Sequence, residues 1–175
     1  MSARHVVVLV EGASDAGVVE LLATAGGLGP GLEVVAMGGV TNITRHLRRL
    51  ADGTPVPVVV GLCDAGERRF LERADPRLDA VLVCDRDLEE ELIRAVGPEQ
   101  VLDVLAELGE LDRFRTFQGQ PEWRDRGLAE QLHRFAGTRS GRKAVLARAL
   151  AARLAPGDVP RPLADLVATV RHHLG

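Results

Sequence analysis

Four short runs of aliphatic residues alternate with helix-length amphipathic segments in the first half of the chain. The runs are Val6 to Val10, Leu32 to Met37, Val56 to Leu62 and Ala80 to Cys84. Apolar runs of this length without polar alternation are typical of strands that are buried on both faces, as parallel strands under helices are. The intervening helical segments are residues 15–25, 41–51, 65–73 and 88–96. This order predicts right-handed crossovers and an α/β fold, with a parallel sheet of about four strands flanked by helices.

The pattern becomes helical almost throughout after Pro98. Helices are predicted over residues 101–111, 127–135, 139–154 and 163–174, with a short strand-like segment over residues 114–117. We therefore expect an α/β core over residues 1–97. A helical, arginine-rich C-terminal extension over residues 98–175 is expected to pack on that core, so that the chain forms one compact unit.

Composition excludes several classes of protein. The longest apolar stretch is far below the roughly 18 residues of a membrane span, so we expect a cytoplasmic protein. The chain contains no tyrosine, which excludes a tyrosyl nucleophile. Cys63 and Cys84 both end apolar runs and fit no disulfide framework or zinc spacing, which favours buried thiols in a reducing compartment.

The formal net charge of −3 conceals an uneven distribution. Residues 1–112 hold 10 basic and 20 acidic side chains, whereas residues 113–175 hold 12 basic and 5 acidic ones. The two parts are either faces of one domain that attract each other, or parts of a metal-dependent enzyme that acts on a polyanion. Of the 22 basic residues, 21 are arginine. Lys143 is the single lysine. It is either an exposed helix residue that is present by chance or a residue with a specific chemical role, for which lysine differs from arginine.

Acidic side chains follow three of the predicted strands at the point where each strand ends. Glu11 follows the first, Asp64 the third and Asp87 the fourth. Because the carboxyl ends of parallel strands meet at one edge, these groups would repel one another unless a cation lies between them. Oxygen ligands alone favour magnesium or manganese. For Asp87 with Glu90, a helix cap with a capping box is an equally good interpretation.

Other motifs are weaker. The glycines between residues 26 and 31 follow a helix rather than separating a strand from a helix, so no nucleotide cofactor is predicted. The single tryptophan, Trp123, either stacks on a base or packs the C-terminal helices against the sheet.

Three motifs resemble the TOPRIM domain, which topoisomerases and bacterial primases share with the OLD-family (overcoming lysogenisation defect) nucleases. They are Glu11-Gly12, the segment Gly38-Gly39-Val40-Thr41-Asn42-Ile43, and Asp64. Residues 87–92 are similar to the second acidic motif of the OLD nucleases. Gly141-Arg142-Lys143 and residues 159–163 resemble their C-terminal basic motif. The resemblance covers nearly the whole chain but no ATPase domain, so the chain resembles a stand-alone TOPRIM domain.

This resemblance implies hydrolysis of phosphodiester bonds in DNA by an endonuclease or nickase that uses two ions of magnesium or manganese. One ion would be held by Glu11, Asp15 and Asp64. The second would be held by Asp87, Glu89 and Glu91. Lys143 would lie beside the scissile phosphate and would share the catalytic role with Glu11. Arg139 and Arg142 would bind the neighbouring phosphates. Arg124, Arg126 and Arg134 either extend this track or lie on a solvated helix face.

One departure from the TOPRIM pattern concerns the third strand. Gly66 replaces the second aspartate of the Asp-x-Asp motif, and Glu67 follows one place later. Either Glu67 reaches the ion or catalysis is weakened or lost. The alternatives to a DNA nuclease are a TOPRIM ribonuclease that processes structured RNA and a catalytically degenerate metal- or nucleic-acid-binding module that acts with a separate ATPase. The sequence leaves the oligomeric state open, and a homodimer is one option that the resemblance implies, since OLD relatives dimerise.

Overall fold

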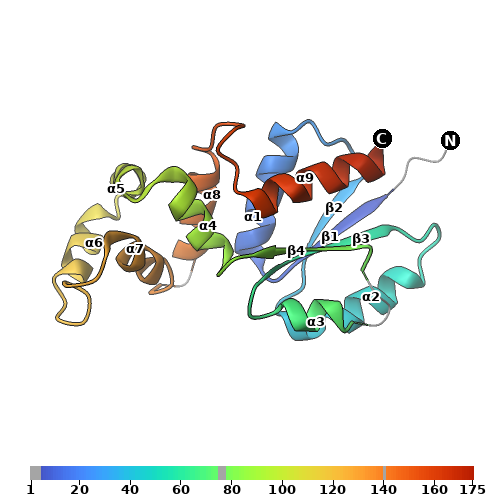
Figure 1. The fold of residues 1–175 in the computed structure, drawn as a ribbon, viewed down its shortest axis with the longest axis horizontal. Coiled ribbons are helices and arrows are strands. Elements are labelled where there is room, and N and C mark those ends of the chain that lie inside the picture. The colour runs from blue at the N-terminus through green and yellow to red at the C-terminus, as the bar shows by residue number, and fades with distance from the viewer. Residues whose placement is uncertain (1–4, 75–77, 140) are drawn as a thin grey trace. The chain divides into compact units, whose positions relative to one another are not determined.

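The computed structural model describes residues 5–74, 78–139 and 141–175 and contains a parallel sheet (Figure 1). The four strands are β1 (Val6–Val10), β2 (Leu32–Ala36), β3 (Val58–Asp64) and β4 (Ala80–Cys84). They lie in the order β2-β1-β3-β4, and every neighbouring pair is parallel. The predicted α/β fold with a four-stranded parallel sheet is confirmed. All five residues of β1 are fully buried, because this central strand is covered on both faces.

The strand register brings the carboxyl ends of β1 and β3 together. Leu9 pairs with Gly61, so that Glu11, which directly follows β1, leaves the sheet at the level of the last residues of β3. Asp64, the last residue of β3, pairs with Cys84 at the end of β4. The sheet thus presents its acidic chain segments at one edge.

Helices cover both faces of this sheet (Figure 1). They are α1 (Ala13–Ala25), α2 (Ile43–Ala51), α3 (Arg68–Glu72) and α9 (Arg161–Leu174), and a 3₁₀ turn, η1 (Val40–Asn42), precedes α2. The helices α1 and α9 lie on one face, and α2 and α3 lie on the other. The last helix is held by Leu163, Leu166 and Val170, whose spacing places them on one buried side.

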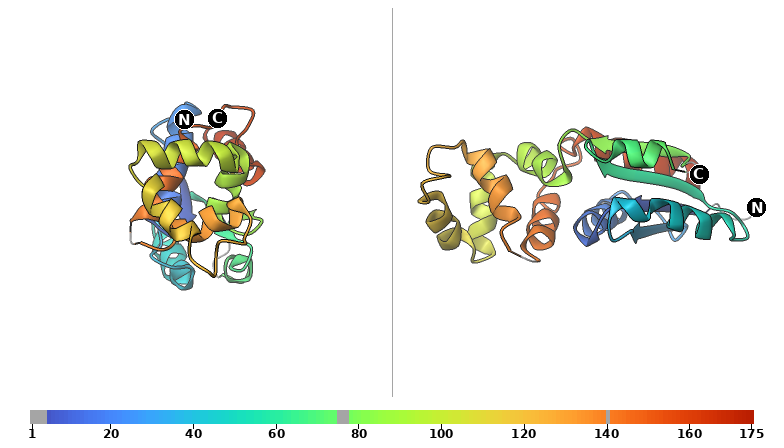
Figure 2. Two further views of the ribbon diagram at one scale, coloured as in Figure 1. Left: turned by 90° about the vertical axis from the view of Figure 1, so that its left-hand side faces the viewer. Right: turned by 90° about the horizontal axis from the view of Figure 1, so that it is seen from below.

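The remaining helices form a second compact unit (Figure 2). They are α4 (Leu88–Val96), α5 (Pro98–Glu107), α6 (Leu111–Gln118), α7 (Leu128–Ala136) and α8 (Arg142–Ala151). The predicted strand-like segment over residues 114–117 is wrong, because these residues belong to α6. Phe114 and Phe117 lie three residues apart on one side of this helix, and both rings contact Phe135. Of the helix predicted over residues 139–154, Ser140 lies outside the described residues.

The chain divides into two compact units. The sheet unit comprises Met1–Asp87 and Pro160–Gly175, and the helical unit comprises Leu88–Val159. These limits differ from the boundary at residue 97 that the sequence suggests, because α4 packs with α7 and α8 whereas α9 returns to the strands. No helix in the described part of the chain is long and apolar enough to cross a membrane.

Candidate metal centre

Three carboxylates converge where β1 and β3 end. Glu11, Asp64 and Glu67 each contribute an oxygen, and these oxygens all lie within 4.8 Å of one another. Each of the three side chains is partly buried. Within the described ranges no other group of three potential ligand residues gathers this closely. The cluster thus contains Glu11 and Asp64, both predicted from the strand ends. It also contains Glu67, the residue that follows the altered Asp-x-Asp motif.

A tight turn after β3 brings Glu67 into the cluster. The Glu67 N–H donates to the Asp64 carbonyl over 2.9 Å, and α3 begins at the next residue. Gly66 lies within this turn, and a Cβ added there would meet no atom within 4 Å. The turn therefore places a glutamate beside Asp64 although the second aspartate of the motif is absent.

Backbone contacts fix the position of Glu11. The N–H groups of Gly38 and Gly39 both donate to the Glu11 carbonyl, over 3.0 and 3.1 Å. Both glycines have positive φ values, +69° and +114°, which residues with a Cβ rarely adopt. Asn42 Nδ2 donates to the Met37 and Gly38 carbonyls over 3.1 and 3.0 Å, and thereby closes the loop. The glycine motif after β2 thus positions the segment that carries Glu11.

Asp15 also contributes to the electrostatics of the cluster. Its Oδ2 accepts a hydrogen bond of 3.0 Å from the Gly12 N–H at the start of α1. Burial raises the pKa of Glu67, and the negative charges of Glu11 and Asp15 raise it further. Mutual repulsion is therefore built into this edge of the sheet.

These residues fit a hard divalent cation. All the ligand atoms on offer are carboxylate oxygens, which magnesium and manganese prefer. Glu67 Oε2 is buried and makes no hydrogen bond with any of the described residues. A buried anionic oxygen without a donor is costly, and a cation would remove that cost.

The carboxylates predicted for a second ion have other surroundings. Asp87 is partly buried and ends the sheet unit. Glu89 and Glu91 lie in the first turn of α4 and are each 3% exposed. In the helical unit, Glu91 forms an ion pair with Arg94, and Glu89 pairs with Lys143.

Lys143 joins α8 to α4. Its Nζ lies 2.9 Å from Glu89 Oε2, and its side chain is 45% exposed. Gly141 precedes α8 in the left-handed conformation, at a φ of +81°. The lone lysine of the chain therefore compensates a buried carboxylate, while its own side chain stays partly exposed.

Four of the predicted phosphate-binding arginines differ in exposure. The Arg142 side chain is only 9% exposed, pairs with Glu110 over 2.9 Å, and lies 4.0 Å from the centre of the Phe135 ring. Its guanidinium is thus engaged inside the helical unit. The other three side chains, of Arg139, Arg124 and Arg126, are about 60% exposed, and their ion pairs with described residues are long, at 3.6 to 3.7 Å.

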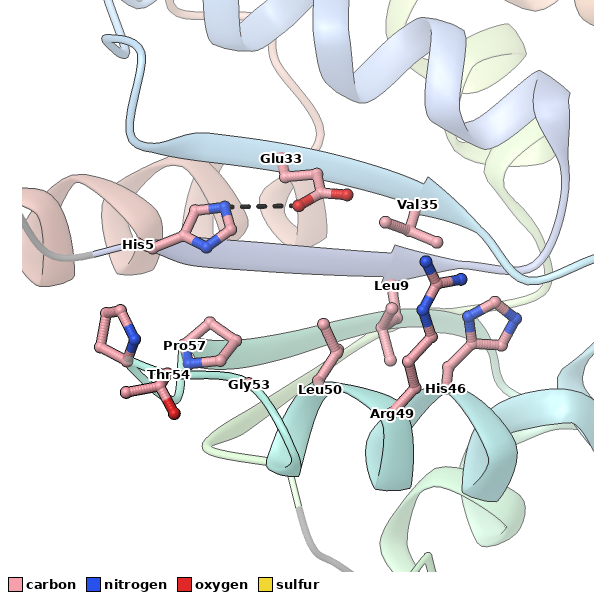
Figure 3. A pocket seen from close by; sticks show the side chains of 11 residues that line it. His5, Leu9, Glu33, Val35, His46, Arg49, Leu50, Gly53, Thr54 and Pro57 are labelled. Atoms are coloured by element: carbon pink, nitrogen blue, oxygen red, sulfur yellow. Dashed lines mark ion pairs between the residues drawn. The ribbon is translucent and has the colours of Figure 1, made fainter.

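A separate cavity of about 410 Å³ lies between α2 and the strands β1 and β2 (Figure 3). His5 and Glu33, which form an ion pair of 3.4 Å, line it together with His46 and Arg49. None of the clustered carboxylates lines this cavity. We therefore place the metal chemistry at the cluster and not in this cavity.

Comparison with known proteins supports the fold. Neither a protein-family model nor a curated protein sequence matches the chain. The C-terminal region of the Burkholderia pseudomallei OLD protein superimposes with a TM-score of 0.66 and 18% identity, over 98% of this chain and 99% of that one. The C-terminal region of the Xanthomonas campestris pv. campestris OLD protein also gives 0.66, with 22% identity over 99% and 98% of the two chains. The expected resemblance is thereby confirmed at the level of the fold: this chain has the TOPRIM fold of the C-terminal regions of OLD proteins.

Proposed function

We propose that this chain is a nuclease-type TOPRIM domain that hydrolyses phosphodiester bonds in DNA with the help of Mg²⁺ or Mn²⁺. The observation that carries the proposal is the convergence of Glu11, Asp64 and Glu67 within 4.8 Å at the carboxyl edge of the sheet. The structural similarity to OLD C-terminal regions supports it.

Each acidic residue has a role in this proposal. Glu11, Asp64 and Glu67 would hold the ion, and Glu67 replaces the second aspartate of the motif. Asp15 adds negative charge beside them and orients the Gly12 N–H at the start of α1. When bound, the cation would polarise a phosphoryl oxygen and make water a better nucleophile. A second ion at Asp87, Glu89 and Glu91 stays a prediction, as does a role for Lys143 at the scissile phosphate.

The test is cleavage of supercoiled plasmid in Mg²⁺, in Mn²⁺ and in chelator. Nicking should require a divalent ion, and Glu11→Gln and Glu67→Gln should each reduce its rate about 100-fold or more, since each removes an electrostatic group of the site. Glu20→Gln is the matched control, because Glu20 is an exposed glutamate of α1 outside the cluster. Nicking that persists in chelator, or in Glu11→Gln at the wild-type rate, would contradict the proposal.

A binding measurement separates catalysis from metal affinity. Titration calorimetry with Mn²⁺ should show binding to the wild-type protein and to Glu20→Gln, but weaker binding to Glu11→Gln and Glu67→Gln. A parallel assay with structured RNA decides between the DNA nuclease and the ribonuclease. Metal binding without cleavage of either nucleic acid would favour a non-catalytic module that acts with a separate ATPase.

A further inference from the structure

An arginine-lined groove of about 430 Å³ lies within the helical unit. The groove is formed by α6, α7 and the segments that follow each of them. Its basic side chains are those of Arg113, Arg134, Arg139 and Arg142, and Trp123 lines the same groove. Arg113 is not among the arginines that the sequence predicts, and it meets Arg134, which belongs to a different helix, only in the folded chain.

Positive charge exceeds negative charge in this groove. Arg113, Arg139 and Arg142 share a single carboxylate, Glu110, over distances of 3.1, 3.6 and 2.9 Å. Arg134 is exposed and forms no ion pair with any described residue, and the acidic side chain that lines the groove is Glu122. Residues 113–153 as a whole hold 10 basic and 3 acidic side chains. Guanidinium groups held so close together repel one another, and an anionic ligand with several phosphates would relieve that repulsion.

A fixed aromatic platform lies beside these arginines. The Trp123 ring stacks on Phe117 at a centroid distance of 5.3 Å and an interplanar angle of 26°, and its side chain remains partly exposed. Gln131, which is buried, donates from Nε2 to the Trp123 carbonyl over 2.7 Å. Gln118 Nε2 in turn donates to Gln131 Oε1 over 2.7 Å. The segment that presents the indole is therefore held in place before any ligand arrives.

We propose that this groove binds single-stranded nucleic acid, with phosphates on Arg113, Arg134 and Arg139 and an unpaired base on Trp123. Arg142 is excluded from the phosphate contacts because its side chain is only 9% exposed and packs on Phe135, whereas the side chains of Arg113 and Arg139 are each 60% exposed. An unpaired base offers its ring face to an aromatic side chain, whereas a duplex buries that face in its own stack. This inference deepens the proposed function and rests on it, because the bound strand is a substrate only if the chain is a nuclease.

The single tryptophan makes the groove directly observable. The chain holds one tryptophan and no tyrosine, so its intrinsic emission comes from Trp123. In chelator, which prevents hydrolysis, titration with a single-stranded oligothymidylate and with an oligouridylate should each quench this emission. Inorganic polyphosphate should compete with the oligonucleotide without quenching, and a duplex of equal length should bind more weakly.

Two arginines provide a matched pair of variants. Arg134 and Arg148 are both exposed and lie in the last turn of their helices, but only Arg134 lines the groove. We expect Arg134→Glu to weaken oligonucleotide binding about tenfold, and to lower the slope of log affinity against log salt by about 0.7, the value for one lost phosphate contact on a single strand. Arg148→Glu should remain within about twofold of wild type.

A conservative series tests the aromatic contact. Trp123→Leu should weaken binding of a labelled oligonucleotide about tenfold, whereas Trp123→Phe should retain most of it, because every aromatic ring offers a stacking face. Circular dichroism of each variant establishes that the helices are intact.

Several results would overturn the proposal. These are equal effects of Arg134→Glu and Arg148→Glu, unchanged Trp123 emission on oligonucleotide binding, and duplex binding as tight as single-strand binding. The outcome is independent of cleavage, since the oligonucleotide titrations are carried out in chelator, which prevents hydrolysis. A protein that binds but does not cut contradicts only the proposed function, and one that cuts without quenching contradicts only this inference.

Discussion

At the scale of single residues, the carboxylates that would bind the metal lower the stability of the metal-free protein. The pKa of Glu67 is raised by burial and by the charges of Glu11 and Asp15, so the folded protein holds a proton there more tightly than the unfolded chain does. The stability that this group contributes is therefore present below its unfolded pKa and is lost as the pH rises through the raised folded value. At neutral pH the metal-free protein carries this cost.

We accordingly expect Glu67→Gln to raise the melting temperature in chelator at about pH 7. The difference from wild type should shrink as the pH falls through the pKa of Glu67, because the wild-type carboxyl then becomes neutral as well. Thermal denaturation followed by circular dichroism between about pH 4 and pH 8 measures this, with Glu20→Gln as control. A lower melting temperature of Glu67→Gln at neutral pH would show that the carboxylate is stabilised by contacts other than those described.

Gly66 tests whether the altered motif is functional. Its φ lies outside the left-handed region and a Cβ there meets nothing within 4 Å, so Gly66→Asp fits the turn without strain. Since Glu67 already completes the cluster, we expect Gly66→Asp to cleave plasmid at a rate within about threefold of wild type. This change is far smaller than the roughly 100-fold loss expected when a carboxylate of the cluster is removed. A large gain in cleavage would instead show that the natural site is degenerate.

At the scale of secondary-structure elements, two helices of the helical unit are joined by a partly buried ion pair. Removal of Lys143 from α8 leaves the buried carboxylate of Glu89 on α4 without this cation. We expect Lys143→Ala to lower the free energy of unfolding by about 1–2 kcal/mol, below the value for a fully buried pair because the lysine is partly exposed. The double variant with Glu89→Gln should recover part of this loss in urea denaturation. A loss of cleavage without a loss of stability would support the catalytic role that the resemblance implies for Lys143.

The packing of Leu71 and Leu78 against β3 depends on a glycine in that strand. A Cβ at Gly61 would lie 2.6 Å from Leu71 Cδ2 and 2.7 Å from Leu78 Cδ2, and both leucines are buried. We expect Gly61→Ala to destabilise the protein by about 1–3 kcal/mol, the usual cost of overpacking. Gly29→Ala is the control, because nothing lies within 4 Å of its added Cβ. Equal urea midpoints for the two variants would mean that the leucines move aside freely.

At the scale of the whole molecule, the cation should act as a stabilising ligand. A divalent ion that binds only the folded chain raises its stability by an amount that grows with concentration, about 2.7 kcal/mol at 100 times the dissociation constant. Mn²⁺ should therefore raise the melting temperature of wild type progressively, and excess chelator should reverse the change. The rise should be much smaller for Asp64→Asn, which removes a cluster ligand. An equal rise in both proteins would indicate binding elsewhere.

The sequence by itself determined the alternation of strands and helices over residues 6–96, the α/β class and two of the three cluster residues. These features follow from local patterns: aliphatic runs mark the strands, and an acidic residue directly after a buried strand must lie at the edge of the sheet. The sequence alone does not decide whether Glu67 belongs to the cluster, because its position depends on the turn after β3 rather than on its spacing.

Only the tertiary structure decided the features that depend on distant partners. The segment 114–117 is helical because Phe114 and Phe117 pack on Phe135, and Arg142 is engaged by Glu110, 32 positions earlier in the chain. The groove likewise combines Arg113 with Arg134. Such contacts join residues through space at separations that periodicity does not encode, so the structure had to supply them.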